Sequence, residues 1–249
     1  MIDVQRRDDV AVIELRHGRV NALDLELVGA LAATVRELAE APIVLTGRGG
    51  VFSAGVDLRR LVDGGADYVA RFLPALDEAL LAVFEAPGPV VAAVNGHAIA
   101  GGCILAAACD VRLMSGGRIG VPELLVGLPF PVAALEILRH AAGSRVDELA
   151  LTGRTVDTSA ALALGLVHEI VPPESLLEEA VRRAGALAQI PQLTYRLTKE
   201  QLRGGARQRI EAARRAHHEG ILAAWQREDA RAAVAAYVDR LAQRDRARP

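Results

Sequence analysis

Two glycine-containing segments hold the residues best suited to chemistry. The first, Phe52 to Leu58, reads FSAGVDL, and the second, Asn95 to Cys103, reads NGHAIAGGC. Each lies where a short apolar stretch gives way to a helical pattern, and the first N–H groups of a helix lack backbone partners and attract negative charge. Two such N–H groups directed at one oxygen form an oxyanion hole, which stabilises a carbonyl as it becomes an enolate. Glycines allow the close backbone approach that this requires.

The elements around these segments alternate in type. Apolar stretches predict strands over 10–15, where the pattern alternates, and over 43–46, 90–94, 111–114, 119–121 and 167–171. Periodic apolar residues predict helices over 22–39, 66–86, 101–109, 131–141, 145–151 and 159–164. Asn21, with Asp24 three residues later, is expected to cap the first helix. Because every periodic segment from Glu174 onward is helical, we expect an α/β core with an α-helical C-terminal region.

Composition limits the classes of protein to which the chain can belong. Its 249 residues, 51% of them hydrophobic, fit a soluble domain, and a net charge of −2 gives no reason to expect a nucleic-acid partner. Cys103 and Cys109 fall on different faces of an apolar helix, so we expect no disulfide and a reducing, cytoplasmic compartment. No metal-ligand spacing is present. The uncharged run 88–108 contains Pro89 and the turn signal Asn95-Gly96, so no membrane span is expected.

Eight short motifs follow one another along the chain. They are RVNAL (19–23), FSAGVDL (52–58), NG to GG (95–102), CD (109–110), PE (122–123), LTG (151–153), ALGLV (163–167) and TK (198–199). Each is weak alone, but in this order and spacing they resemble the enoyl-CoA hydratase/isomerase (crotonase) superfamily over nearly the whole chain. The resemblance implies a crotonase-like ββα superhelix over 1–190 and a helical trimerisation region over 191–249. It also implies a homotrimer or dimer of trimers, an acyl-CoA thioester substrate, and no cofactor beyond the coenzyme A moiety.

The family's binding residues carry over by motif. Its two oxyanion donors correspond to the backbone N–H groups of Val56 and Gly101. Its acyl-CoA contacts around the first donor correspond to Ala54, Val56, Asp57, Leu58 and Arg59. Arg59 stands where the family often has a basic residue near the phosphates of coenzyme A, and Ala54 is expected in the adenine-side pocket. The ordinary alternatives are an exposed helical arginine for Arg59 and a helix cap for Asp57.

One departure from the family pattern directs the choice of reaction. Hydratases of this family use two glutamates, of which Glu123 is present after Pro122, whereas Ile104 occupies the position of the other. Adding water to a double bond takes two carboxylates, and isoleucine can neither accept nor donate a proton. Shifting a double bond from C3=C4 to C2=C3 takes one base, which removes a proton from C2 and returns it to C4. We therefore expect a Δ3,Δ2-enoyl-CoA isomerase in which Ile104 lines a dry site and burial raises the pKa of Glu123.

Two alternatives to the isomerase stay open. One is an enoyl-CoA hydratase or lyase of the same superfamily with a second acid supplied from elsewhere, and the other is a non-catalytic acyl-CoA-binding subunit. The segment GLPFPV (127–132) looks more like the Pro-Phe segment of isomerases. Phe130 is accordingly expected to pack on the acyl chain, with a core aromatic at a helix start as the alternative.

Other conspicuous side chains have ordinary explanations. His97 is expected to be a packed, hydrogen-bonded histidine. The arginine-rich segment 203–218 is expected to be a solvated helix face, with an anionic ligand or a neighbouring subunit as the alternative. Tyr195, Trp225 and Tyr237 are expected to serve packing or the trimer interface, with a contact from Tyr237 to coenzyme A as a further option.

Overall fold

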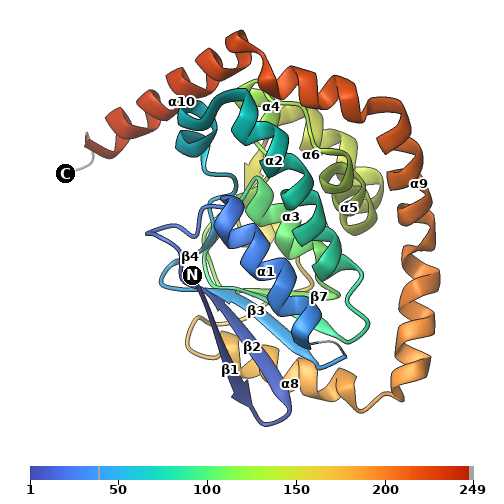
Figure 1. Cartoon of the computed structure of the whole chain (residues 1–249). Helices are drawn as coiled ribbons and strands as arrows, with labels where there is room; N and C mark the ends of the chain where they lie inside the picture. Colours follow the sequence, from blue (N-terminus) through green and yellow to red (C-terminus); the bar gives the residue numbers. More distant parts are fainter. Residues whose placement is uncertain (39, 247–249) are drawn as a thin grey trace.

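The computed structural model describes residues 1–38 and 40–246, which form two sheets flanked by helices (Figure 1). The larger sheet has the order β1-β2-β3-β5-β7-β10, with strands Ile2–Arg7, Val10–Leu15, Ile43–Gly47, Val90–Val94, Val111–Met114 and Glu169–Ile170. The smaller has the order β4-β6-β8-β9, with strands Val51–Ser53, His97–Ile99, Ile119–Gly120 and Thr155–Val156. The β1–β2 and β8–β9 pairs are antiparallel, and all other pairs are parallel.

From β3 to β8, successive strands alternate between the two sheets, and a helix follows each pair of strands. β3 and β4 lead into α2 (Leu58–Phe84), and β5 and β6 lead into α3 (Gly101–Ala108). This is the predicted ββα superhelix. Because each turn repeats the same path, the two glycine-containing segments become neighbours, with β4 parallel to β6.

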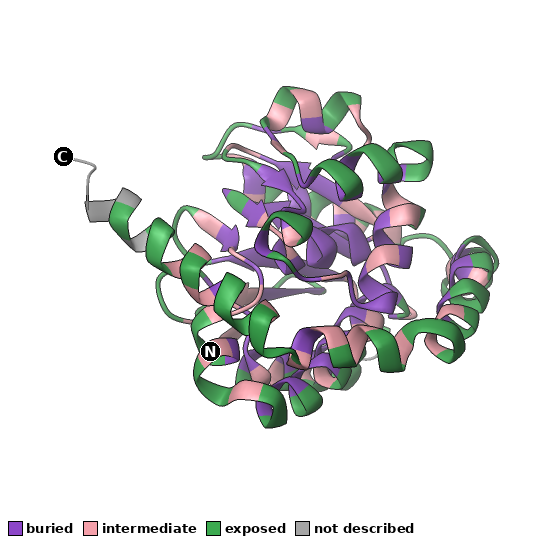
Figure 2. Ribbon diagram, turned by 90° about the horizontal axis from the view of Figure 1, so that it is seen from above, coloured by how far each residue is buried: buried purple, intermediate pink, exposed green. Residues whose placement is uncertain are grey.

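The inner strands of the larger sheet are buried on both faces, whereas most of the edge strand β1 is exposed. Leu45 of β3 packs into the main core beside α1 (Leu25–Leu38), α2 and α3, while the preceding Val44 belongs to a second cluster under α8 (Leu176–Ala188). The strand predicted over 10–15 is confirmed as β2, which is buried along nearly its whole length. Covering both faces is what parallel sheets require. Figure 2 shows this buried centre in purple.

The start of α1 corrects the predicted cap. Asp24, not Asn21, caps the helix, because the N–H of Leu27 donates to Asp24 Oδ1 at 2.9 Å. Asn21 has a φ of +50°, and its side-chain amide donates to the carbonyl oxygens of Val51 (3.0 Å) and Phe52 (3.2 Å). Asn21 thus tethers β4 rather than a helix end. The helix ends at Leu38, and the predicted end at residue 39 lies outside the described residues.

Several other boundaries differ from the prediction. The helix predicted over 66–86 begins at Leu58 and is kinked at Gly65, where φ is +57°. The strand predicted over 167–171 is shortened to β10, and the prediction missed β1, β4, β6 and β9. The middle of the chain contributes α4 (Glu123–Val126), α5 (Val132–Ala142), the 3-10 turn Gly143–Arg145, α6 (Val146–Thr152) and α7 (Thr158–Ala163).

Two long helices complete the chain. α9 (Gln192–Gln226) runs along one side of the core against α5 and α2, and α10 (Glu228–Arg246) crosses back over α2 (Figure 1). The prediction of a solvated face over 203–218 is wrong for Arg203, which is buried and ion-paired with Asp110. Within the described residues, no helix combines the length and apolarity needed to cross a membrane.

Candidate active site

A cavity of about 340 Å³ opens where the two glycine-containing segments meet. Its walls come from both segments, from α2 to α5, and from the two C-terminal helices. The lining residues are Ala54, Val56, Leu58, Leu76, Leu80, Ile99, Ala100, Gly101, Ile104, Pro122, Glu123, Val126, Leu128, Pro131, Ala134, Trp225, Tyr237 and Leu241. Glu123 is the sole acidic side chain in this lining, and the remainder is largely apolar, as is usual for small-molecule pockets.

Val56 presents its backbone to the cavity because its neighbours are fixed by a short parallel bridge. Leu23 donates its N–H to Gly55 O at 2.8 Å and accepts the N–H of Asp57 at 2.9 Å. This pattern turns the N–H of Val56 to the opposite side. Among the described residues, the structure records no partner for that N–H or for the N–H of Gly101. Both groups therefore keep a free donor beside the same cavity.

The two segments are in direct backbone contact. A Cβ placed on Gly55 would lie 2.6 Å from Ile99 O and 2.9 Å from Gly101 N, and the φ of Gly55 is +82°. A larger residue would therefore clash as well as strain the backbone. Ser53 fixes the same turn, since its hydroxyl donates to Asn21 O at 2.8 Å and accepts the N–H of Gly55 at 3.1 Å.

Ala100, the residue before Gly101, has a strained backbone. Its φ and ψ are +53° and −124°, a combination that costs a residue with a Cβ about 1–3 kcal/mol. Two hydrogen bonds hold it there: its N–H donates to Gly120 O at 2.8 Å, and its carbonyl accepts the N–H of Ile104 at 3.1 Å. The strained turn starts α3 at Gly101 without any side-chain cap. The first N–H groups of α3 are thereby left available to a ligand.

Glu123 is the first residue of α4, and its carboxyl group enters an apolar environment. Its Oε2 atom is buried and has no hydrogen-bond partner within the described residues. Burial raises the pKa of Glu123 from 4.5 to about 8, because the charged form loses its hydration. Ile104, fully buried, lines the same cavity. A carboxyl group whose pKa lies near neutral pH, and which has no fixed hydrogen-bond partner, can both accept and donate a proton.

Comparison with known proteins agrees with this geometry. The sequence pattern of the family described as enoyl-CoA hydratase/isomerase matches residues 5–244. The chain belongs to that family. It is 38% identical over 211 residues to a putative enoyl-CoA hydratase of Thermus thermophilus, covering 81% of this chain and 83% of the relative.

Members with isomerase names are also similar to this chain. Human mitochondrial enoyl-CoA delta isomerase 1 is 28% identical over 241 residues, which cover 93% of this chain and 80% of the relative. The crystal structure of human mitochondrial delta3-delta2-enoyl-CoA isomerase superposes with a TM-score of 0.91 at 26% identity, covering 98% of each chain. A probable enoyl-CoA hydratase from Mycobacterium tuberculosis superposes with a TM-score of 0.81 at 31% identity, covering 88% of this chain and 96% of that one.

This enoyl-CoA hydratase/isomerase family member brings together most of the site residues expected from the sequence. Ala54, Val56, Leu58, Gly101, Ile104 and Glu123 all line the cavity. Asp57 and Arg59 do not. Asp57 caps α2 by accepting the N–H groups of Arg59 (3.0 Å) and Arg60 (3.1 Å), and Arg59 is exposed.

Phe130 fits the alternative given for it, and His97 differs from its expected place. Phe130 is a buried core residue just before α5 that also lines a groove between α5 and α9; this fits the alternative of a core aromatic at a helix start and gives no support to a contact with an acyl chain in the Glu123 cavity. His97 is exposed rather than packed, although its Nδ1 does accept the N–H of Arg118 at 3.3 Å.

Of the residues that the C-terminal helices bring to the cavity, the sequence indicates only Tyr237, as an option beside packing, and sequence reasoning missed Trp225 and Leu241. Trp225, Tyr237 and Leu241 line the cavity, and the Trp225 indole N–H donates to Pro129 O at 2.8 Å. The available signal was the four-residue spacing of Tyr237 and Leu241, which places both on one face of a helix. That spacing does not show which part of the protein this helix face packs against.

Proposed function

We propose that this protein is an acyl-CoA double-bond isomerase that converts Δ3-enoyl-CoA to Δ2-enoyl-CoA. The observation that carries the proposal is that Glu123 is the single carboxyl group that the described residues bring to the cavity, with no described partner for its Oε2 among apolar walls. The high structural similarity to a delta3-delta2-enoyl-CoA isomerase supports it.

In the proposed reaction the thioester carbonyl oxygen accepts the N–H groups of Val56 and Gly101. The Glu123 carboxylate removes a proton from C2, and the electron pair moves into the carbonyl to give a dienolate. The protonated Glu123 then delivers the same proton to C4 as the C2=C3 bond forms. The reaction consumes no water and releases no group, so one carboxyl group suffices. Donors already fixed in place stabilise the developing oxyanion without reorganisation.

The burial of Glu123 suits this role. The C2 proton is a weak acid, and a carboxylate whose pKa is about 8 is a stronger base than an ordinary one. Ile104 supplies an apolar wall in place of a second acid, which disfavours a bound nucleophilic water. Arg59, exposed at the start of α2, is proposed to meet the phosphates of coenzyme A, Ala54 to line the adenine-side pocket, and Leu58 to contact the acyl-CoA.

An enoyl-CoA hydratase is the second candidate, favoured by the name of the Thermus thermophilus relative. Hydration would need a second acid in addition to Glu123, and the described cavity lining contains none. The remaining alternative is a non-catalytic acyl-CoA-binding subunit. A homotrimer or dimer of trimers and a cytoplasmic location stay predictions.

The test offers purified protein 3-enoyl-CoA and 2-enoyl-CoA separately. We expect turnover of the 3-enoyl thioester to exceed hydration of the 2-enoyl thioester, and Glu123→Gln to lower the isomerisation rate by about 10²–10⁴-fold. Acyl-CoA binding should persist in Glu123→Gln, because the proposed carbonyl donors are backbone groups. Glu174→Gln, which removes an exposed carboxyl group far along the chain, is the matched control. Faster hydration than isomerisation would favour the hydratase, and full activity of Glu123→Gln would refute Glu123 as the base.

A further inference from the structure

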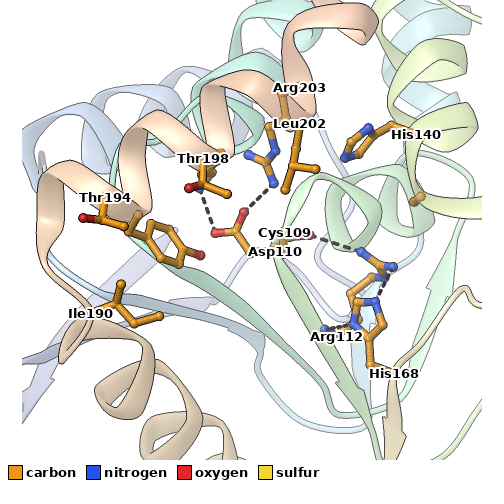
Figure 3. Close-up of a pocket in the computed structure, with 13 residues that line it drawn as sticks. Cys109, Asp110, Arg112, His140, His168, Ile190, Thr194, Thr198, Leu202 and Arg203 are labelled. Carbon is orange, nitrogen blue, oxygen red and sulfur yellow. Dashed lines mark hydrogen bonds and ion pairs between the residues drawn. The ribbon is translucent and has the colours of Figure 1, made fainter.

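A second cavity, of about 460 Å³, shares no lining residue with the Glu123 cavity (Figure 3). It lies between the start of β7 and the N-terminal half of α9. Asp110 and Arg112 come from the β7 side, and Lys199 and Arg203 come from α9. The reaction proposed at Glu123 uses none of these side chains.

One carboxylate in this cavity serves two cations. Asp110 Oδ2 accepts from Lys199 Nζ at 2.7 Å, and Asp110 Oδ1 accepts from Arg203 Nη2 at 2.5 Å. Asp110 also accepts the N–H of Val90 at 2.7 Å. Both cations are buried, with Arg203 only 5% exposed. Asp110 can neutralise only one of them.

Arg112 adds a third positive charge that has no acidic partner within the described residues. Its guanidinium donates to the carbonyl oxygens of Leu166 (2.7 Å), Cys109 (3.2 Å) and Gly165 (3.3 Å), and contacts His168 Nε2 at 3.0 Å. All of these acceptors are neutral, because burial and the nearby arginines lower the pKa of His168 to about 4. Burial likewise lowers the pKa of His140, which also lines the cavity.

The lining therefore carries three cations and one carboxylate, and one of the cations is incompletely bonded. Arg203 Nη1 is buried and has no hydrogen-bond partner in the described chain, while the guanidinium carbon lies 4.3 Å from the centroid of the Phe84 ring. A buried charge without a counter-ion is costly, and so is an unused buried donor. A small anion in the cavity would offset the surplus positive charge of its lining.

We propose that this cavity binds a small oxyanion, a phosphate or a carboxylate, through Arg203, Lys199 and the field of Arg112. Oxyanions match the donor geometry of a guanidinium group, which presents paired N–H groups to two oxygens. The mouth of the cavity is apolar and open, since Leu202 lines it and is 69% exposed. The inference does not depend on the reaction at Glu123.

The chain offers a specific reporter for this site, because Lys199 is its only lysine. Protein grown on [ε-13C]lysine should give one lysine signal by NMR, located in the cavity. At constant pH and ionic strength, inorganic phosphate should move that signal saturably, and potassium chloride should not. A parallel titration with acetate distinguishes a carboxylate site from a phosphate site. A signal that phosphate and acetate both leave in place, or that chloride moves equally, would overturn the proposal.

Two glutamate substitutions on α9 locate the effect. Leu202→Glu places a tethered carboxylate at the mouth of the cavity and should weaken binding of the moving anion by about tenfold through competition and repulsion. Leu193→Glu is the matched control, since Leu193 is 58% exposed on the same helix but does not line the cavity. Arg203→Met should abolish the saturable shift. Equal weakening by both glutamates, or unchanged binding in Leu202→Glu, would contradict the assignment.

Discussion

Replacing Glu123 by glutamine should abolish proton transfer and yet stabilise the protein at alkaline pH. The pKa of Glu123 is about 8 in the folded protein, against an ordinary value of 4.5. Between these two values the folded state holds the proton and the unfolded state has released it. The free energy of unfolding therefore falls as pH rises through this window. Glutamine cannot ionise, so the Glu123→Gln variant does not lose stability in this way as pH rises.

The size of the effect follows from the difference in pKa. Each unit of pKa corresponds to about 1.4 kcal/mol. Between pH 5 and pH 9, the native protein should lose about 4 kcal/mol of stability relative to Glu123→Gln. This figure is an upper bound, because water that enters the cavity on ionisation would reduce it. The difference should be smallest at pH 5, which lies only half a unit above the ordinary pKa of 4.5, so that little of the loss has yet accumulated.

Guanidinium chloride unfolding of both proteins at pH 5, 7 and 9 measures the effect directly. Protein concentration must be held fixed, because any association would add to the apparent stability. Glu174→Gln controls for the loss of a carboxyl group from an exposed position. If native protein and Glu123→Gln gave parallel stability profiles across this range, the carboxyl group would not be desolvated, and the argument for a strengthened base would fail.

Four further predictions rest on the same geometry. The kcat/KM for isomerisation should rise with pH along a limb with a midpoint of about 8, the pKa of Glu123 in the free enzyme, as a pH–rate profile would report. Ala100→Gly should raise stability by about 1 kcal/mol by relieving the backbone at φ +53°, measurable by thermal unfolding at unchanged KM. Gly55→Ala should cost about 2 kcal/mol or more and lower kcat, since its Cβ would lie 2.6 Å from Ile99 O. Ile104→Glu should depress isomerisation and raise hydration of 2-enoyl-CoA, and a hydration rate that stays at the native level would argue against position 104 as the choice between reactions.

Much of the fold and most of the site could be predicted, because the motifs encode backbone requirements. Glycine at 55 and 101 marks close approach between chain segments, and the structure brings these two segments into contact. The first helix cap failed for a tertiary reason. Asn21 and Asp24 are both good caps by composition, but Asn21 is held at positive φ by hydrogen bonds to β4, more than 25 residues away in the sequence. The local sequence pattern cannot decide between two candidate N-cap residues when hydrogen bonds to a distant strand determine which of them caps the helix.

The misplacements at the rim of the site have a similar origin. Trp225, at the end of α9, and Tyr237, on α10, reach the cavity because α9 packs against α2 and α10 folds back over it, and no local periodicity specifies that path. Arg203 looked like one of many surface arginines, yet it is buried against Asp110, a partner 93 residues earlier in the chain. In an arginine-rich helix, the sequence alone therefore does not show which arginine is buried, because that depends on an acidic partner elsewhere in the chain.

The burial that makes Glu123 a strong base also decides which reaction it can serve. Apolar walls raise its pKa by excluding water, and the same exclusion removes the reactant that a hydratase needs. Base strength and water exclusion are thus two consequences of one arrangement, in which Ile104 forms part of the wall and the C-terminal helices supply Trp225 and Tyr237. A second carboxylate at position 104 would have to bring water with it to stay ionised, and would change both properties together. For this reason the proposed choice of isomerisation over hydration rests on the isoleucine more than on the paired backbone donors, which any reaction through a thioester enolate could use.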